Sequence, residues 1–181
     1  MRLANRITLI SALCLSSVSC MKEKLEATYN QQEDKINSYI ESAIGGNSEY
    51  TVTRNNGSNR LTTTQGTGEG LEADGAISFY YAGYVFNGRV NLADLFVTNR
   101  KASADDAGWD LTDADYEVLT INLSDSELLP GLKDGLIGVK GGEECEIIFS
   151  GKYGFGKKPF GIIPANSALL YKIWVISISN E

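Results

Sequence analysis

Apolar and polar residues alternate along several stretches from residue 76 onward, as they do in strands that bury one face. In AISFYYAGYVFNGRV, Ile77, Phe79 and Tyr81 fall on one side of a predicted strand, and Asn87-Gly88 is typical of a tight turn. LTINLS predicts another short strand. Two further strands alternate in the same way, and their inward residues are Cys145, Ile147, Phe149, Leu169, Tyr171, Ile173 and Val175. These stretches predict an antiparallel sheet.

Two segments have the periodicity of helices. PGLKDGLIGV predicts a short helix with Pro130 in its first turn, Leu132 and Leu136 on one face, and Gly138 at its end. A longer helix is predicted over residues 23–43, where apolar residues recur at helical spacing before a Gly-Gly pair. It is either a spacer lying on the domain or a helix that binds a partner or a second copy.

The segments between these elements are polar. Asn55-Asn56-Gly57 predicts the turn of a hairpin, and residues 65–70 are expected to join that hairpin to the main domain. Residues 91–118 form a long polar excursion, which is either a functional surface loop or a tolerated insertion. The elements together predict an α+β fold, with a short helix laid on an antiparallel sheet.

The composition narrows the chemistry. The 181 residues carry a net charge of −7, which argues against a nucleic-acid partner. The chain has no His, which excludes a Ser-His-Asp or Cys-His site within it. Cys145 is the one cysteine beyond residue 20, so the body has no internal disulfide framework, and we expect Cys145 to be an inert core residue.

The N-terminal sequence MRLANRITLISALCLSSVSC is typical of a secretory signal, with Arg2 and Arg6 before a short apolar run. That run is too short for a permanent membrane-spanning helix. A small residue directly before Cys20 resembles a bacterial lipoprotein cleavage site, which predicts a signal peptide over residues 1–20 and a lipid on Cys20. The alternative is an ordinary signal peptide in which Cys20 is incidental. Cleavage removes both arginines and changes the net charge from −7 to −9.

Three segments in sequence order resemble the FKBP-type peptidyl-prolyl isomerases. FYYAG is similar to the family's V-x-Y-x-G strand, and ELLPGLKDGLIGVKGGEE to its E-V-I-x-G-W segment with the glycines that follow. GKYGFG with IIPANSALLYKIWV resembles the family's D-Y-A-Y-G and I-P-P-N-A-x-L ending. The likeness covers about residues 74–179. Together with the lipoprotein-like start, the chain resembles cell-envelope FKBP lipoproteins of the Bacteroidetes, anchored to the outer membrane on its periplasmic or surface side.

The resemblance implies a twisted antiparallel sheet wrapped around one short helix, preceded by the N-terminal helix and hairpin. It divides the chain into the signal at 1–20, the helix, hairpin and linker at 21–73, and an FKBP-like domain at 74–181 with an insertion at about 91–118. It also implies a pocket that takes proline-containing polypeptides and FK506-like ligands and needs no cofactor or metal. Carried over by position, the pocket residues are Tyr81, Phe96, Leu119, Leu128, Leu129, Leu132, Phe155, Ile163 and Tyr171.

The chain departs from the family pattern at four positions. The family's Asp, Trp and second Pro are replaced by Val97, Leu132 and Ala165, and the loop tyrosine is Phe155. Losing one hydroxyl donor typically removes a hydrogen bond worth about 1 kcal/mol of discrimination, which lowers the rate a few-fold. We therefore expect weakened prolyl isomerisation, with a non-catalytic peptide-binding or chaperone lipoprotein as the alternative. A third reading is a scaffold lipoprotein whose working surface is residues 23–70.

Two tryptophans lie outside the implied pocket set. Trp174 falls on the face of the last strand opposite Tyr171, and we expect it to pack under the N-terminal helix or hairpin. Trp109 lies in the polar excursion, where it either caps the pocket or anchors that loop on itself.

Overall fold

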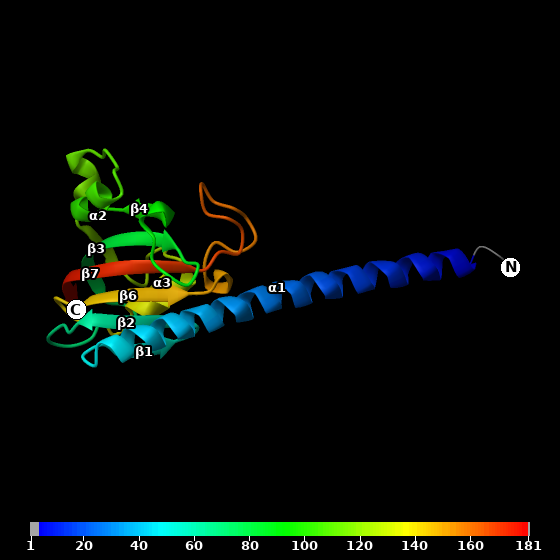
Figure 1. The fold of residues 1–181 in the computed structure, drawn as a ribbon, viewed down its shortest axis with the longest axis horizontal. Helices are drawn as coiled ribbons and strands as arrows, with labels where there is room; N and C mark the ends of the chain where they lie inside the picture. The colour runs from blue at the N-terminus through cyan, green and yellow to red at the C-terminus, as the bar shows by residue number, and fades with distance from the viewer. Residues whose placement is uncertain (1–3, 181) are drawn as a thin grey trace.

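One antiparallel sheet forms the body of the computed structural model, which describes the backbone of residues 4–180 and the side chains of residues 21–180 (Figure 1). The strands are β1 Thr51–Asn55, β2 Ser58–Thr64, β3 Ala76–Val85, β4 Leu95–Thr98, β5 Leu119–Asn122, β6 Glu144–Phe149 and β7 Leu169–Ser179. Their order is β1-β2-β6-β7-β3-β4, and β5 pairs with the other end of β3. The last strand, β7, therefore lies between β6 and β3 in the interior of the sheet.

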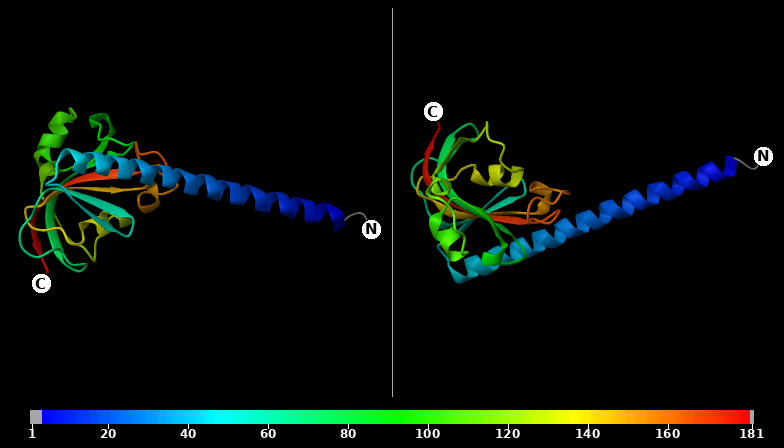
Figure 2. Two further views of the ribbon diagram at one scale, coloured as in Figure 1. Left: turned by 60° about the horizontal axis from the view of Figure 1, so that its bottom comes forward. Right: turned by 90° about the horizontal axis from the view of Figure 1, so that it is seen from above.

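The helices cover opposite faces of this sheet (Figure 2). The helices are α1 Ala4–Gly46, α2 Lys101–Asp106 and α3 Pro130–Leu136, with short 3-10 turns η1 Leu92–Asp94, η2 Asp113–Tyr116 and η3 Gly151–Tyr153. The helix predicted over residues 23–43 is part of α1, which also runs back through the predicted signal segment. The side chain of Cys20 and residues 1–3 of that segment lie outside the described part of the chain. Within the described residues, no helix is long and apolar enough to cross a membrane.

The main core lies between the sheet and α3. The inward residues predicted from the alternation, including Phe79, Ile147 and Ile173, are buried there with Leu132 and Leu136 of α3. Cys145 belongs to this core, where burial raises the pKa of its thiol. Gly135 allows α3 to approach β6 closely, because a Cβ at this position would overlap the Ile147 side chain.

A second core lies between the other face of the sheet and α1. Ile36 and Ile40 of α1 are fully buried against residues of β3 and β7, such as Tyr84 and Leu170. Trp174 packs against this cluster, as predicted, and the Arg100 guanidinium lies 4.0 Å from its ring centroid. Trp109 also packs against this second core. It does not line the pocket, so it does not cap it; the cluster it joins includes Leu95 and Ala107 of its own loop.

The N-terminal hairpin is continuous with the sheet. Asn56 and Gly57 form its turn with φ of 46° and 84°, as the sequence predicts. Its second strand, β2, then pairs with β6 along most of its length, so the hairpin extends the sheet of the main body. Arg60 of β2 also donates hydrogen bonds to the carbonyls of Gly135 and Ile137 at the end of α3, at 3.0 and 2.7 Å.

The polar excursion of residues 91–118 contains regular structure. It holds β4, which pairs with β3, and the short helix α2. Asn99, between these two elements, is buried and accepts a hydrogen bond from the Tyr81 amide at 2.7 Å. It also donates to the Phe79 and Glu117 carbonyls, which fixes the excursion to β3. This segment is therefore part of the sheet edge and is more than a surface loop.

Candidate functional site

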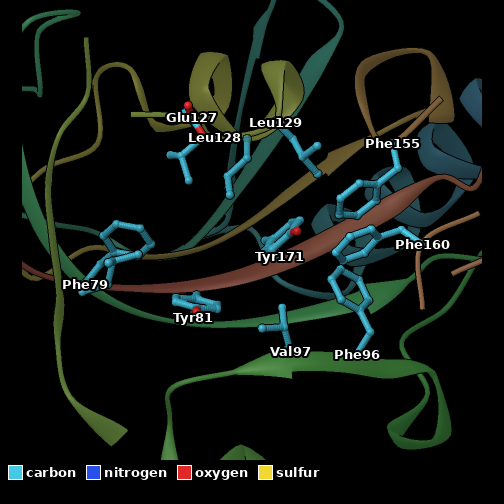
Figure 3. Close-up of a pocket in the computed structure, with 12 residues that line it drawn as sticks. Phe79, Tyr81, Phe96, Val97, Glu127, Leu128, Leu129, Phe155, Phe160 and Tyr171 are labelled. Atoms are coloured by element: carbon cyan, nitrogen blue, oxygen red, sulfur yellow. The ribbon is translucent and has the colours of Figure 1, made fainter. Parts of the chain in front are cut away.

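A pocket of about 350 Å³ opens between the concave face of the sheet and the start of α3 (Figure 3). The walls come from strands β3, β4, β5 and β7, from the segment that leads into α3, and from the loop between β6 and β7. The lining residues are Phe79, Tyr81, Phe96, Val97, Leu119, Glu127, Leu128, Leu129, Leu132, Phe155, Phe160 and Tyr171. All but Glu127 are apolar or aromatic, and Glu127 is exposed at the rim.

The aromatic rings hold one another in place. Tyr171 stacks on Phe149 with centroids 6.1 Å apart, and Phe96 meets Tyr171 edge-on at 5.7 Å. Phe155 lies edge-on to Phe96 at 6.4 Å. Such edge-on and offset pairs are the favoured arrangements of aromatic side chains. The pocket is thus an apolar cavity built on the sheet, whose shape does not depend on a single side chain.

Two tyrosine hydroxyls are the polar groups within this apolar wall. Burial raises the pKa of both Tyr81 and Tyr171, so each keeps its proton at neutral pH. Within the described part of the chain, neither hydroxyl has a hydrogen-bond partner. Val97 lines the pocket at the position where the resemblance places an Asp. The two hydroxyls are therefore available to a ligand that enters the pocket.

Leu129 lines the pocket just before α3. It has an extended conformation (φ −54°, ψ 139°) immediately before α3, and Pro130 occupies the first position of the helix. In residues 4–180, no acceptor is found for the Leu129 N–H. Leu129 is half-buried, and a backbone N–H without a partner beside the pocket can donate to a carbonyl oxygen of a bound peptide.

The pocket loop, residues 154–166, is anchored to α1 at its base. Gln32 of α1 donates to the Asn166 carbonyl at 2.7 Å and accepts from the Gly151 amide at 2.8 Å. Tyr29 of α1 donates to the Asn166 side chain at 3.1 Å. Asn166 has a φ of 57°, and its amide bonds to the Gly156 carbonyl, which closes the loop. The helix that leads to Cys20 is therefore in direct contact with a wall of the pocket.

The structure brings together all but one of the nine pocket residues expected from the sequence. Ile163 is the exception: it is buried in the main core, and its backbone pairs with Phe160 while its side chain does not line the cavity. Four lining residues were absent from the expected set, namely Phe79, Val97, Glu127 and Phe160. Phe79 shares a strand face with Tyr81, so the alternation of β3 was a sufficient signal for it.

A half-wrapped antiparallel sheet with an apolar cavity over one short helix defines an FKBP-like protein. A family model for FKBP-type peptidyl-prolyl cis-trans isomerase matches residues 74–176. Because this match covers more than half of the chain, the protein belongs to that family. Members of the family bind proline-containing peptides and FK506-type ligands.

Individual relatives are distant in sequence. FK506-binding protein 1 of Aspergillus oryzae is 24% identical over 123 residues, which cover 68% of this chain and 99% of that protein. FkpA from Escherichia coli has a TM-score of 0.56 and 18% identity, covering 99% of this chain and 74% of that one. A peptidyl-prolyl cis-trans isomerase from Pseudomonas syringae pv. tomato has a TM-score of 0.57 and 16% identity. The match covers 86% of this chain and 96% of that one. The structural likenesses establish the fold.

Proposed function

We propose that the protein isomerises X-Pro bonds in envelope or secreted polypeptides, with catalysis weakened relative to the family pattern. The observation that carries this proposal is an apolar, aromatic-walled cavity with one unpartnered backbone donor, the Leu129 amide, at its edge. Such a site fits a prolyl ring in the cavity and a peptide carbonyl on the amide.

The chemistry requires no acid, base or nucleophile. Rotation about an X-Pro bond is slow because amide resonance must be broken. The twisted transition state has less charge separation than the planar amide, so an apolar cavity disfavours the planar form more than the twisted one. A donor that holds the neighbouring carbonyl in the twisted geometry adds to this difference. The rate rises only by the extent to which the twisted form is bound more tightly than the planar form.

Two residue positions support the proposal that catalysis is weakened. Phe155 lines the pocket without a hydroxyl, and Val97 supplies no carboxylate beside Tyr81. Each lost hydrogen bond costs about 1 kcal/mol of discrimination, or roughly fivefold in rate. The cavity itself is preserved, since Leu132 lines it in place of the family's Trp.

The test is acceleration of a proline-limited refolding reaction by the full chain. Leu129→Pro removes the amide donor while keeping the backbone angle, because proline fixes φ near −65° and Leu129 is at −54°. Leu129→Ala is the matched control, since it shortens the same side chain and retains the N–H. We expect kcat/KM about fivefold to tenfold lower for the Pro variant than for the Ala variant. Equal activity of the two variants would refute the role of this amide, and no acceleration by the unchanged protein would refute the isomerase.

The same missing groups favour one alternative, a peptide-binding module without catalysis. The pocket walls needed for binding are present, whereas the donor at Phe155 is absent. Calorimetric titration with a proline-containing peptide separates the two functions. Binding at micromolar concentration without any acceleration of refolding would establish the binding module.

We further propose that the protein is a cell-envelope lipoprotein of the Bacteroidetes type, anchored through Cys20 to the outer membrane. The support is the signal-like sequence that ends at a small residue before Cys20. Two or more acyl chains hold a protein on a membrane stably, whereas a single chain does not. Mass spectrometry of the membrane-extracted protein tests this directly. An N-terminal peptide without a lipid on Cys20 would exclude the anchor.

A further inference from the structure

The tip of the pocket loop displays apolar side chains to solvent. Ile162 is 67% exposed and Phe160 is 63% exposed, the latter while stacking on Phe155 with centroids 4.9 Å apart. The backbone holds this tip in a tight turn, since the Phe160 and Ile163 amides bond to each other's carbonyls at 3.0 and 2.9 Å. Gly161, with a φ of 56°, makes the turn. Ile162 is therefore held outward by a defined turn, and it does not line the pocket.

The charge of this loop is opposite to that of the chain. Residues 154–166 contain two lysines and no acidic residue, although the chain carries a net charge of −7. Lys157 and Lys158, beside the tip, are exposed and make no ion pair within the described part of the chain. Across a groove from Lys157, the start of the described side chains on α1 contributes Lys22, Lys24 and Glu26. Glu23 lies on the same turns, so this part of α1 is neutral and the excess positive charge comes from the loop.

This loop lies at the end of the domain from which α1 projects toward its N-terminus (Figures 1 and 2). The loop base contacts α1 at Tyr29, and the helix between Cys20 and Tyr29 rises only about 14 Å. Met21, 73% exposed, lies on the same groove as Lys157. A lipid on Cys20 therefore brings the loop to within a few helical turns of the bilayer surface.

We propose that the loop tip, Lys157 to Ile162, and the first turns of α1 beyond Cys20 form one docking surface for an anionic bilayer. This inference rests on the proposed lipid anchor at Cys20. Exposed apolar side chains flanked by lysines are the composition of segments that lie in the membrane interface. Ile162 enters the boundary between headgroups and acyl chains, and the lysines contact the anionic headgroups. Docking holds the mouth of the pocket beside the membrane.

The test places a reporter at the tip of the full chain, anchored through Cys20 to vesicles of phosphatidylglycerol and phosphatidylethanolamine with brominated acyl chains. Ile162→Trp reports on the tip. Ile176→Trp is the matched control, because it is also an exposed isoleucine (53%) but lies near the end of β7 remote from the loop. Emission of the native Trp109 and Trp174 is measured in the unchanged protein and subtracted. We expect lipid bromine to quench the Ile162→Trp signal about twofold and the control only slightly. Equal quenching of the two would overturn the proposal.

The second part of the experiment tests the role of the lysine charges. Lys157→Glu with Lys158→Glu, added to the Ile162→Trp chain, should remove most of the quenching, as should neutral phosphatidylcholine vesicles. Quenching that persists unchanged in both cases would overturn the role of the lysines. A proline-containing peptide that shifts the Ile162→Trp emission in solution, while vesicles do not, would assign the tip to the client and refute the bilayer.

Failure of the anchor and failure of docking are distinguishable. Mass spectrometry reports whether Cys20 carries a lipid. Where it does not, the Cys20 thiol of the Cys14→Ser chain is coupled to a maleimide lipid and the same quenching is measured. Isomerase activity is assayed separately in detergent, where Lys157→Glu and Lys158→Glu should leave it unchanged because neither residue lines the pocket.

Discussion

Phe155 is the residue at which the chemistry of the pocket departs most clearly from the family pattern. Its ring lines the cavity between Phe96 and Phe160, so its para position is the place where a tyrosine would present a hydroxyl. The sequence resemblance predicted this ring in the wall, and the structure places it there. The identity of a side chain can be read from the sequence, whereas its orientation toward the cavity depends on the packing of three rings.

Phe155→Tyr should restore a donor and raise kcat/KM in proline-limited refolding about fivefold. Phe160→Tyr is the matched control, because it adds the same hydroxyl to the neighbouring stacked ring, which is largely exposed. An equal gain for both variants would show that added polarity alone, and not a donor at residue 155, changes the rate.

Buried tyrosines also make the free energy of unfolding depend on pH under alkaline conditions. Burial raises the pKa of Tyr39, Tyr81 and Tyr171 above the ordinary value of 10.0. Above pH 10 the folded state therefore binds more protons than the unfolded chain. The contribution of these tyrosines to the free energy of unfolding is constant below pH 10 and falls as the pH rises above 10. We expect Tyr171→Phe to make this fall shallower, by at most about 1.4 kcal/mol per pH unit. Urea unfolding across a pH series measures the slope, and an unchanged slope would contradict the assignment.

Ile163 is a residue whose place in the pocket was predicted wrongly from its position in the sequence. It occupies the expected place in the loop sequence, but the Phe160–Ile163 turn directs its side chain into the main core and leaves Phe160 at the cavity. A single tight turn decides which of two neighbouring apolar residues meets the ligand. Glu127 and Val97 were missed for a related reason, since their places at the rim depend on how α3 and β4 approach the sheet.

Among the elements, those with strong local signals were predicted correctly. The helix α3, with Pro130 at its start, and the hairpin turn at Asn56-Gly57 agree with the sequence prediction. The pairing of β2 with β6 was not predicted, because it joins residues far apart in the chain and has no local signature. The same holds for β4, whose short strand lies within a polar segment and is recognisable only through its pairing with β3.

The close approach of α3 to β6 leads to a prediction at this scale. Gly135→Ala places a methyl group against Ile147, which should push the helix away and lower the free energy of unfolding by about 1–3 kcal/mol. Gly45→Ala is the control, because nothing lies within 4 Å of its Cβ position and alanine favours a helix. Urea denaturation measures both variants, and an undiminished stability of Gly135→Ala would show that the helix has room to move.

At the scale of the whole molecule, α1 extends away from the domain and contacts the base of the pocket loop (Figure 1). Gln32→Ala removes two hydrogen bonds at the loop base, those to the Asn166 carbonyl and from the Gly151 amide. We expect amide hydrogen exchange in residues 154–166 to become about tenfold faster and the KM for a peptide to rise. Ser38→Ala is the control on the exposed side of the same helix, where the hydroxyl bonds only to Asp34. Equal exchange in both variants would show that the loop holds its shape without the helix.

The interior position of β7 has a consequence for the order in which the domain folds. Both halves of the sheet, β1-β2-β6 and β3-β4-β5, attach to this strand, because β7 pairs with β6 on one side and with β3 on the other. In chain order β7 follows all the other strands. The two halves therefore cannot be joined into one sheet until residues 169–179 are available to both.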